Sequence, residues 1–377
     1  MTEFPLDNGI VEPPSDSTSG LLPEATPAVA EESAQRLRLP PSAVNIGAPI
    51  LGAIVGLLIG AALILIAGHN PITAYAAMAK GAFGGSRQIS ETILKATPLL
   101  IVGLGLTVAF RARVWNIGGE GQYHIGALLG AMVALFLPNL PRVPLIVLML
   151  LAGALGGVLW AIIPGILKVK RGMNVIISTL MLNYVAILLI QYLARGPLQE
   201  PGGYLPESAQ LVRAARLPGL LGSRIHIGVV LAGLLVPVIY ALLWGTPLGF
   251  RLRAVGSKES VARYAGYNVE WSILFALALS GALAGLAGIM EVSTLHTRLK
   301  PEISGGYGFS GILVALLGRL HPVGVLVAAI FFAALIIGAQ TMHILAELPE
   351  TLADAIQAVV VLSVLAVDAL AHRKELT

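Results

Sequence analysis

Polar side chains that could hold a small solute are concentrated in two short stretches of an otherwise apolar chain. Residues 116–122 read NIGGEGQ and offer amide and carboxylate groups at Asn116, Glu120 and Gln122. Residues 305–310 read GGYGFS and offer hydroxyl groups and aromatic rings at Tyr307, Phe309 and Ser310. Amides and hydroxyls hydrogen-bond to polar solutes, and aromatic side chains add a flat apolar face. Both stretches could therefore bind a solute by hydrogen bonding and stacking.

A third polar stretch, Thr246–Asn268, carries charge instead. It holds four basic residues and a single acid. Ser257 could cap a short helix over Lys258–Ala265, and Gly266 could end that helix in a left-handed conformation. A capped helix on a basic loop between two apolar spans favours a docking element for a soluble partner, with an ordinary connector as the alternative. The expected coupling residues are Arg253, Gly256, Ser257, Lys258, Glu259, Ala262, Arg263 and Gly266.

Other kinds of chemistry find no support in the sequence. The chain has no cysteine, and its seven histidines are too scattered for a metal-binding pair. It has no phosphate-binding GxxxxGK[ST] motif. A GxGxxG occurs at Gly306, Gly308 and Gly311, but no strand is predicted before it, so we do not assign it to nucleotide binding. We expect no metal, no bound cofactor and no enzyme site; if ATP drives this protein, a separate chain must bind and hydrolyse it.

The composition indicates a membrane protein. The 377 residues are 56% hydrophobic and only 12% charged, whereas soluble domains carry about 25% charged residues. The net charge of +4 is spread between the apolar spans. This spread indicates membrane orientation and contact with lipid rather than nucleic-acid binding.

The expected fold is all-α, with about ten membrane passes and both termini in the cytosol. Residues 1–45 are expected to form a disordered cytosolic tail, 46–371 the transmembrane domain with its loop at 246–268, and 372–377 a cytosolic end. The pass that starts at Val143 is expected to end at Pro164. The apolar run Gly311–Leu317 is too short for a full pass and indicates a broken or re-entrant helix. Close helix packing is expected at Gly52, Gly56, Gly60, Gly281, Gly285 and Gly288.

Polar groups at membrane depth are costly, and irregular backbone is tolerated there only where protein or water satisfies it. We therefore expect Asn116, Glu120, Gln122, Tyr307, Phe309 and Ser310 to line a translocation path or its gate. The alternative is a structural kink whose polar groups are satisfied between helices. For the isolated polar residues Asn183, Gln191 and Gln340, hydrogen bonding between helices is favoured.

Four segments carry a family resemblance. They are TPLLIVGLGLTVAFRARVWNIGGEGQYHIGALLGA (97–131), GMNVIISTLMLNY (172–184), TPLGFRLRAVGSKESVARYAGYNV (246–269) and GGYGFSGILVALLGRLHPVG (305–324). Together they resemble the permease subunits of bacterial ABC importers for nucleosides and simple sugars, within the wider group of ribose and branched-chain amino acid permeases. The NIGGEGQ form is most similar to the nucleoside branch.

The resemblance implies a subunit of the bacterial plasma membrane and a set of partners. An extracytoplasmic solute-binding protein, often a lipoprotein, would deliver the solute, and a cytosolic ABC ATPase would dock on the loop around residues 256–266. A second permease, identical or different, would complete the membrane part.

Two other functional classes remain as alternatives. An ion-driven secondary transporter would need ionisable groups within its spans, and Glu120 and Glu291 are the candidates. A purely structural membrane scaffold would leave the polar interruptions without a reason. Within the ABC class, simple sugars and branched-chain amino acids are the alternative solutes.

Overall fold

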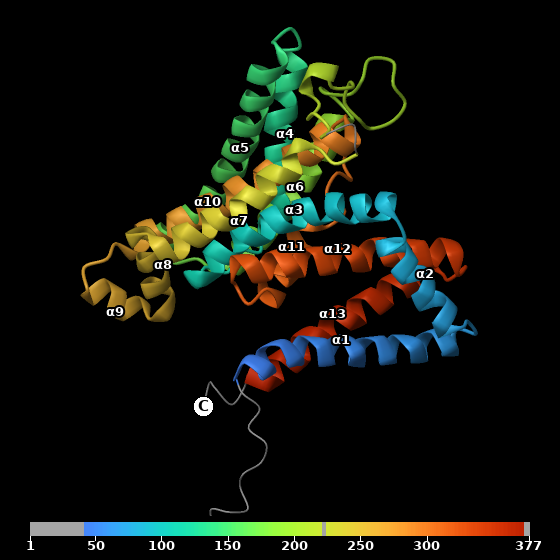
Figure 1. Cartoon of the computed structure of the whole chain (residues 1–377). Helices are drawn as coiled ribbons and strands as arrows, with labels where there is room; N and C mark the ends of the chain where they lie inside the picture. Colours follow the sequence, from blue (N-terminus) through green and yellow to red (C-terminus); the bar gives the residue numbers. More distant parts are fainter. Residues whose placement is uncertain (1–40, 221–223, 373–377) are drawn as a thin grey trace, which may run out of the picture. The chain divides into compact units, whose positions relative to one another are not determined.

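The computed structural model describes residues 41–220 and 224–372 (Figure 1). These ranges contain no β-strand, only isolated bridges between Gln199 and Ser208 and between Gly219 and His226, so the all-α prediction is confirmed for them. The α-helices are α1 Pro41–Ile66, α2 Pro71–Phe83, α3 Ser86–Arg111, α4 Gly119–Phe136, α5 Arg142–Arg171, α6 Val175–Ala194, α7 Ile227–Gly245, α8 Pro247–Ser257, α9 Glu259–Tyr264, α10 Val269–Glu291, α11 Tyr307–Leu317, α12 Pro322–Leu345 and α13 Glu350–His372. A 3₁₀ turn, η1 (Arg213–Ala215), and a π turn, η2 (Val292–His296), complete the set.

Both chain ends are described only in part. Residues 1–40, most of the expected disordered tail, and 373–377, most of the expected cytosolic end, lie outside the described residues. The helix α1 begins at Pro41.

Within the described ranges, eight helices are long and apolar enough to cross a bilayer. They are α1, α3, α5, α6, α7, α10, α12 and α13. The other two expected passes, α4 and α11, are not among them. The 11 residues of α11 span about 16 Å at 1.5 Å per residue, roughly half of the hydrocarbon core. The expected count of about ten therefore depends on two helices that length and composition do not identify as membrane spans.

One expected helix end is wrong. The helix α5 continues through Pro164 and ends at Arg171, with Gly172 in a left-handed conformation behind it. Proline removes one backbone donor, but neighbouring helices and local adjustment accommodate it inside apolar helices. The true end is marked by basic residues and glycine, a common pattern at helix C-termini.

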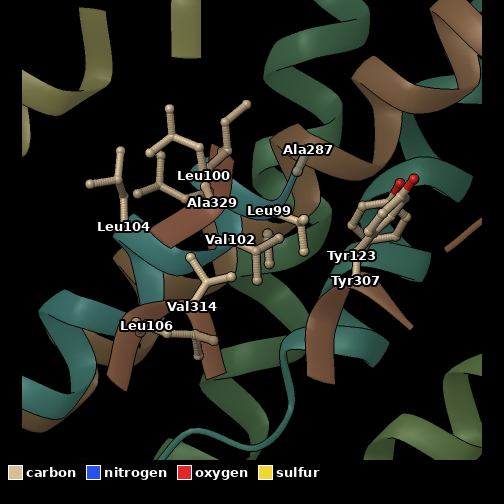
Figure 2. Close-up of a cluster of buried hydrophobic side chains, with 14 of the residues drawn as sticks. Leu99, Leu100, Val102, Leu104, Leu106, Tyr123, Ala287, Tyr307, Val314 and Ala329 are labelled. Atoms are coloured by element: carbon tan, nitrogen blue, oxygen red, sulfur yellow. The ribbon is translucent and has the colours of Figure 1, made fainter. Parts of the chain in front are cut away.

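The two most buried spans are α3 and α10. In α3, 89% of the apolar window is buried, and in α10 67%, against 28% in α5, α6, α7 and α13. The helix α10 packs on α3, α4 and α5, and α3 also contacts α11 and α12. Figure 2 shows side chains of α3, including Leu99, Val102 and Leu106, meeting residues of α10, α11 and α12. The less buried helices expose large apolar side chains such as Leu58 and Leu188, as expected of surfaces that face lipid or another subunit.

The predicted packing glycines lie at close helix crossings. A Cβ on Gly281 would lie 2.3 Å from the Gly157 carbonyl oxygen, and one on Gly285 would lie 2.2 Å from the Gly153 carbonyl oxygen. On α1, a Cβ on Gly52 would lie 2.5 Å from the Cα of Val364 on α13. Since real Cβ atoms essentially never come within 3.0 Å of another heavy atom, only glycine permits these approaches. The packing prediction is confirmed.

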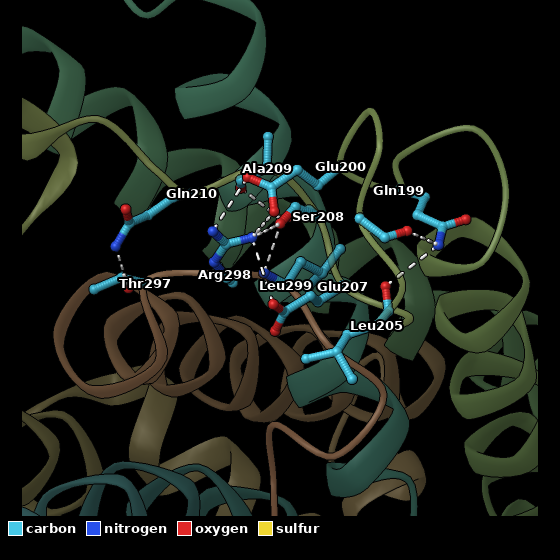
Figure 3. A network of polar contacts seen from close by, with 11 residues as sticks. Gln199, Glu200, Leu205, Glu207, Ser208, Ala209, Gln210, Thr297, Arg298 and Leu299 are labelled. Atoms are coloured by element: carbon cyan, nitrogen blue, oxygen red, sulfur yellow. Dashed lines mark hydrogen bonds and ion pairs between the residues drawn. The ribbon is translucent and has the colours of Figure 1, made fainter.

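The long loop 195–226 is fastened to the segment that follows α10 (Figure 3). The backbone amide of Ser208 donates to the Leu299 carbonyl at 2.9 Å, and the amide of Leu299 donates to Ser208 Oγ at 2.9 Å. Arg298 Nη1 lies 2.5 Å from Glu200 Oε2 and 3.4 Å from Glu207 Oε1. The hydrogen bond from Arg298 lowers the pKa of Glu200 below its ordinary value. We call this side of the protein the long-loop end, and the side that carries α8 and α9 the α8–α9 end.

Candidate functional site

The first polar stretch lies at the middle of α10. The helix α3 ends at the α8–α9 end, where a Cβ on Gly256 would lie 2.0 Å from the Arg111 carbonyl oxygen. The chain then turns back, and Asn116 Nδ2 donates to Ser280 Oγ at 3.0 Å. Ser280 lies halfway along α10 (Val269–Glu291). The non-helical segment 112–118 therefore returns to the level of the middle of α10, which we call mid-depth, and α4 begins there.

The amides of this stretch bond to each other. Asn116 Nδ2 donates to Gln122 Oε1 at 2.9 Å, and Gln122 Nε2 donates to Asn116 Oδ1 at 3.0 Å. Asn116 Oδ1 also accepts from the backbone amide of Gly118 at 2.9 Å. Both side chains are buried. The pair holds the first turn of α4 against α10.

The helix α6 satisfies the irregular backbone of the same stretch. Asn183 Oδ1 accepts from the Gly121 amide at 2.8 Å, and Asn183 Nδ2 donates to the Ile117 carbonyl at 2.8 Å. Thr179 Oγ1 accepts from the Ile117 amide at 3.2 Å. Asn183 thus bonds between helices as predicted, and its partners are the backbone groups that the break leaves free.

The N-termini of α4 and α11 cross at Glu120. The buried carboxylate accepts from the backbone amide of Gly308 at 2.8 Å. A Cβ on Gly308 would lie 2.1 Å from the backbone nitrogen of Glu120, so glycine is needed there. The N-terminus of a helix carries partial positive charge. The N-termini of α4 and α11 therefore meet at mid-depth, and the buried Glu120 carboxylate lies close to both.

The structure divides the second polar stretch between two sides of α11. Tyr307 is 5% exposed and faces the core, whereas Phe309 is 39% exposed. Two residues along a helix differ by about 200° around the axis. Ser310 is half-buried, and its amide bonds to the Gly306 carbonyl at 2.9 Å. Tyr307 is therefore buried in the interior, as Asn116, Glu120 and Gln122 are, whereas Phe309 is exposed.

Sequence reasoning missed a charged cluster around Tyr307. Lys95 Nζ on α3 donates to the Tyr307 hydroxyl at 2.6 Å, and that hydroxyl donates to Glu291 Oε1 at 3.4 Å. His296 Nε2 lies 4.0 Å from the same carboxylate. The only sequence signal was that ionisable residues are rare within apolar spans and mark functional positions. We call Lys95, Tyr307 and Glu291 the charged cluster.

Tyr123 lies beside this cluster. Its ring centroid is 6.0 Å from that of Tyr307, and Figure 2 shows the two hydroxyl groups projecting to the same side. The side chain is fully buried, and its hydroxyl has no hydrogen-bond partner among the described residues.

The loop Thr246–Asn268 contains two short helices where one was expected. Thr246 caps α8 by accepting from the Gly249 amide at 3.1 Å, and Pro247 occupies its first turn. The helix α8 runs through Ser257, so the expected cap at Ser257 is wrong, and α9 starts at Glu259 with no side-chain cap. Gly266 has φ +82°, which confirms the predicted left-handed end.

The eight expected coupling residues fall into supporting and exposed groups. Gly256 and Ala262 are buried, and Arg253 is half-buried. The exposed ones are Ser257, Lys258, Glu259, Arg263 and Gly266. Two apolar residues of α9 that sequence reasoning missed are also exposed, Val261 at 57% and Tyr264 at 95%. Tyrosine and arginine, here Tyr264 and Arg263, are enriched in protein interfaces.

Trp244, at the end of α7, connects this loop to the rest of the α8–α9 end. The guanidinium of Arg253 lies 5.7 Å from its ring centroid, and that of Arg111 lies 5.1 Å away. The His321 ring, before α12, lies 5.1 Å from the Trp244 ring. Arg111 Nε also donates to the Leu320 carbonyl at 2.9 Å. One indole therefore contacts groups from α3, α8 and the turn between α11 and α12.

A cavity of about 540 Å³ opens beside these elements. Its lining includes Arg113, Trp115, Lys168, Asn174 and Glu259, which come from the segment after α3, the last turn of α5, the N-cap of α6 and the first residue of α9. In the described part of the chain, no three His, Asp or Glu side chains gather in a way that could hold a metal ion.

Comparison with known proteins gives a consistent picture. A family model described as "Branched-chain amino acid transport system / permease component" matches residues 88–365. The glucose ABC transporter permease protein TsgB13 of Haloferax volcanii is 36% identical over 86% of this chain and 88% of its own length. The guanosine ABC transporter permease protein NupP of Bacillus subtilis is 36% identical over 84% and 92%. The nucleoside ABC transporter permease protein NupB of Lactococcus lactis is 31% identical over 78% and 84%.

Each of these three organisms also has a second permease that matches more weakly, at 28%, 29% and 25% identity respectively. No solved structure matches the chain.

Proposed function

This chain belongs to the permease component family of branched-chain amino acid transport systems, and from that membership we propose that it is one of two membrane subunits of an importer for nucleosides or related sugar-containing solutes. Its relatives are ABC transporter permeases, and the chain is a transport subunit of that class. The names of the relatives mention glucose, guanosine and nucleosides. These solutes share a polyhydroxylated sugar, which supports the proposed solute class.

The observation that carries the transport mechanism is the crossing of α4 and α11 at mid-depth. Discontinuous helices place backbone donors and polar side chains inside the membrane, where continuous helices offer none. Glu120 closes this crossing through the Gly308 amide. We propose that Asn116, Glu120, Gln122 and Tyr307 line the path or its gate, and that Phe309 and Ser310 border it from the other side of α11.

The charge distribution supports an orientation. Basic residues follow α3 and end α5 at the α8–α9 end, where Arg111, Arg113, Lys168, Lys170 and Arg171 lie. Cytosolic segments are enriched in lysine and arginine. We therefore place the α8–α9 end in the cytosol and the long-loop end outside, in a bacterial plasma membrane.

An ATPase that docks on α9 would supply the energy. Val261 and Tyr264 present an apolar contact on a helix that Ala262 anchors from below. Movement of α8 and α9 would reach α3 and the end of α11 through Trp244, because Arg253, Arg111 and His321 all contact its ring.

Two further partners complete the proposal. The fastened long loop offers an ordered surface for an extracytoplasmic solute-binding protein at the opposite end. The pairs of permeases in the three organisms of the relatives support a second, different permease beside this one.

The experiment that tests the proposal uses the complex purified through this chain and reconstituted with its binding protein. Wild-type complex is expected to take up radiolabelled guanosine only with ATP. Tyr264→Ala on α9 should lose uptake and ATPase association, whereas Tyr204→Ala, an equally exposed tyrosine (101%) of the long loop, should keep the ATPase. Retained ATPase binding and uptake in Tyr264→Ala would contradict the coupling role.

A second experiment tests the gate. Glu120→Gln keeps an oxygen that can accept from Gly308 but removes the charge that two helix N-termini stabilise. Uptake should change while ATPase binding and complex yield stay at wild-type level. Unchanged uptake kinetics in Glu120→Gln would count against the gate.

A further inference from the structure

We propose that Tyr123 and the charged cluster form a hydroxyl-binding subsite for the sugar part of the permeant. This inference rests on the proposed function and names the residues that would bind the hydroxyl groups of the sugar. The four residues come from α3, α4, α10 and α11 and meet between the mid-depth crossing and the long-loop end.

The hydroxyl of Tyr123 is the observation that points to a ligand. A buried hydroxyl without a partner costs free energy that folding does not recover. Phenylalanine would fill the same space without that cost. A partner that the described residues do not supply, such as a solute hydroxyl, would satisfy the group.

The neighbouring groups suit hydroxyl partners. Lys95 offers donors, the Glu291 carboxylate offers acceptors, and the Tyr307 hydroxyl between them can do either. Each hydroxyl of a sugar both donates and accepts, so it can take the place of Tyr307 between the ammonium and the carboxylate. Because the cation and the anion balance, the set favours a neutral polyol over a charged solute.

The space beside Glu291 is small in this structure. A cavity of about 10 Å³ is lined by Glu291 together with residues such as Thr97, His226 and Thr294, and the other three residues of the subsite do not line it. Such a volume is about that of one water molecule. Movement of α11 away from α3 would separate Tyr307 from Lys95 and open the subsite to a larger group.

The experiment compares Tyr123→Phe with wild type in the complete reconstituted importer. The solutes are guanosine and its 2′,3′-dideoxy analogue, each supplied at saturating binding protein. We expect Tyr123→Phe to lower kcat/KM for guanosine about tenfold, the ratio expected for one lost hydrogen bond to a buried donor, and to leave the dideoxy analogue unchanged. Glu291→Gln and Lys95→Met should likewise lower the ratio of kcat/KM for guanosine to kcat/KM for the dideoxy analogue.

Tyr75→Phe is the matched control. Its hydroxyl donates to the Leu57 carbonyl at 2.5 Å on the other side of the protein. This variant should keep wild-type discrimination although it loses a hydrogen bond. Thermal unfolding adds a second readout, because Tyr123→Phe removes no internal bond and should be at least as stable as wild type, whereas Tyr75→Phe should be less stable.

The outcomes separate the two proposals. If Tyr123→Phe transports both solutes as wild type does, the subsite is overturned while the importer function stands. If the wild-type complex transports neither solute with ATP, the proposed function fails and the subsite fails with it.

Discussion

Individual residues at the mid-depth crossing combine a steric and an electrostatic requirement. Gly308 must lack a side chain because α11 passes over the backbone of Glu120, and Glu120 must offer an acceptor because the Gly308 amide would otherwise be buried without one. The Gly308 amide lies in the first turn of α11, where the helix itself provides no acceptor. The crossing is therefore more sensitive to single substitutions than the apolar surface around it.

Replacement of Gly308 by alanine tests the steric requirement. Its Cβ would lie 2.1 Å from the Glu120 nitrogen, so the helices must separate. Overpacking of this kind costs about 1–3 kcal/mol, and we expect a lower unfolding temperature in detergent. Gly233→Ala in α7 is the control, since nothing lies within 4 Å of its Cβ position. Alanine there should be neutral or stabilising. Equal unfolding temperatures for the two variants would contradict the close crossing.

The sequence allowed part of this site to be predicted. Polar residues 116–122 stand out because apolar spans surround them, and Tyr307 stands out for the same reason. Lys95 could not be assigned a partner, because Tyr307 lies 212 positions away in the chain and no local pattern connects them. The unpartnered hydroxyl of Tyr123 is likewise a property of packing, which sequence spacing does not reveal.

Among the elements, the loop Thr246–Asn268 shows how two possible helix starts, at Thr246 and at Ser257, compete. Thr246 and Pro247 are a good cap and a good first residue for a helix, but Thr246–Asn268 is expected from the sequence to be a basic loop with its one helix over Lys258–Ala265. In the structure, α8 starts directly after the Thr246 cap and continues to Ser257, which is its last residue. The Pro164 error has the opposite origin, because a strong breaker in water is tolerated in an apolar helix.

Replacement of Trp244 tests the mechanical role of that element junction. Trp244→Ala removes the ring that Arg111, Arg253 and His321 share. We expect ATP hydrolysis by the complex to continue while uptake falls at least several-fold. Trp271→Ala is the control, since Trp271 stacks on Phe275 of its own helix at 5.2 Å. If Trp244→Ala transports with the wild-type ratio of solute to ATP, the junction does not transmit the movement.

The fastening of the long loop should depend on pH. The pKa of Glu200 is lowered mainly by the hydrogen bond from Arg298, so this bond stabilises the loop above the ordinary glutamate pKa of about 4.3. That contribution is lost as the pH falls through the lowered value, while Arg298 stays charged. Proteolysis within 199–208 should therefore become faster in acid. Glu200→Gln should remove the acid-dependent step, and a step that persists in this variant would assign it to another group.

At the scale of the whole molecule, the proposed function requires that the energy for transport come from a partner of this chain. Among the described residues, the buried carboxylates Glu120 and Glu291 each have a partner, because Glu120 accepts from the Gly308 amide and Glu291 accepts from the Tyr307 hydroxyl. A carrier driven by ions needs a group that binds and releases the ion in each cycle. In the proposed function, the exposed Val261 and Tyr264 of α9 instead form the contact for the ATPase.

Reconstitution of the lone chain tests whether a partner must supply the energy for transport. In vesicles with an imposed proton or sodium gradient, the chain alone should accumulate no guanosine if, as proposed, a partner binds the ATP and the hydrogen bond from Gly308 to Glu120 belongs to a closed gate. Addition of the second permease, the ATPase, the binding protein and ATP should start accumulation in the same vesicles. Accumulation by the lone chain that depends on the ion gradient and disappears in Glu291→Gln would instead identify a secondary transporter, with the charged cluster as its ion site.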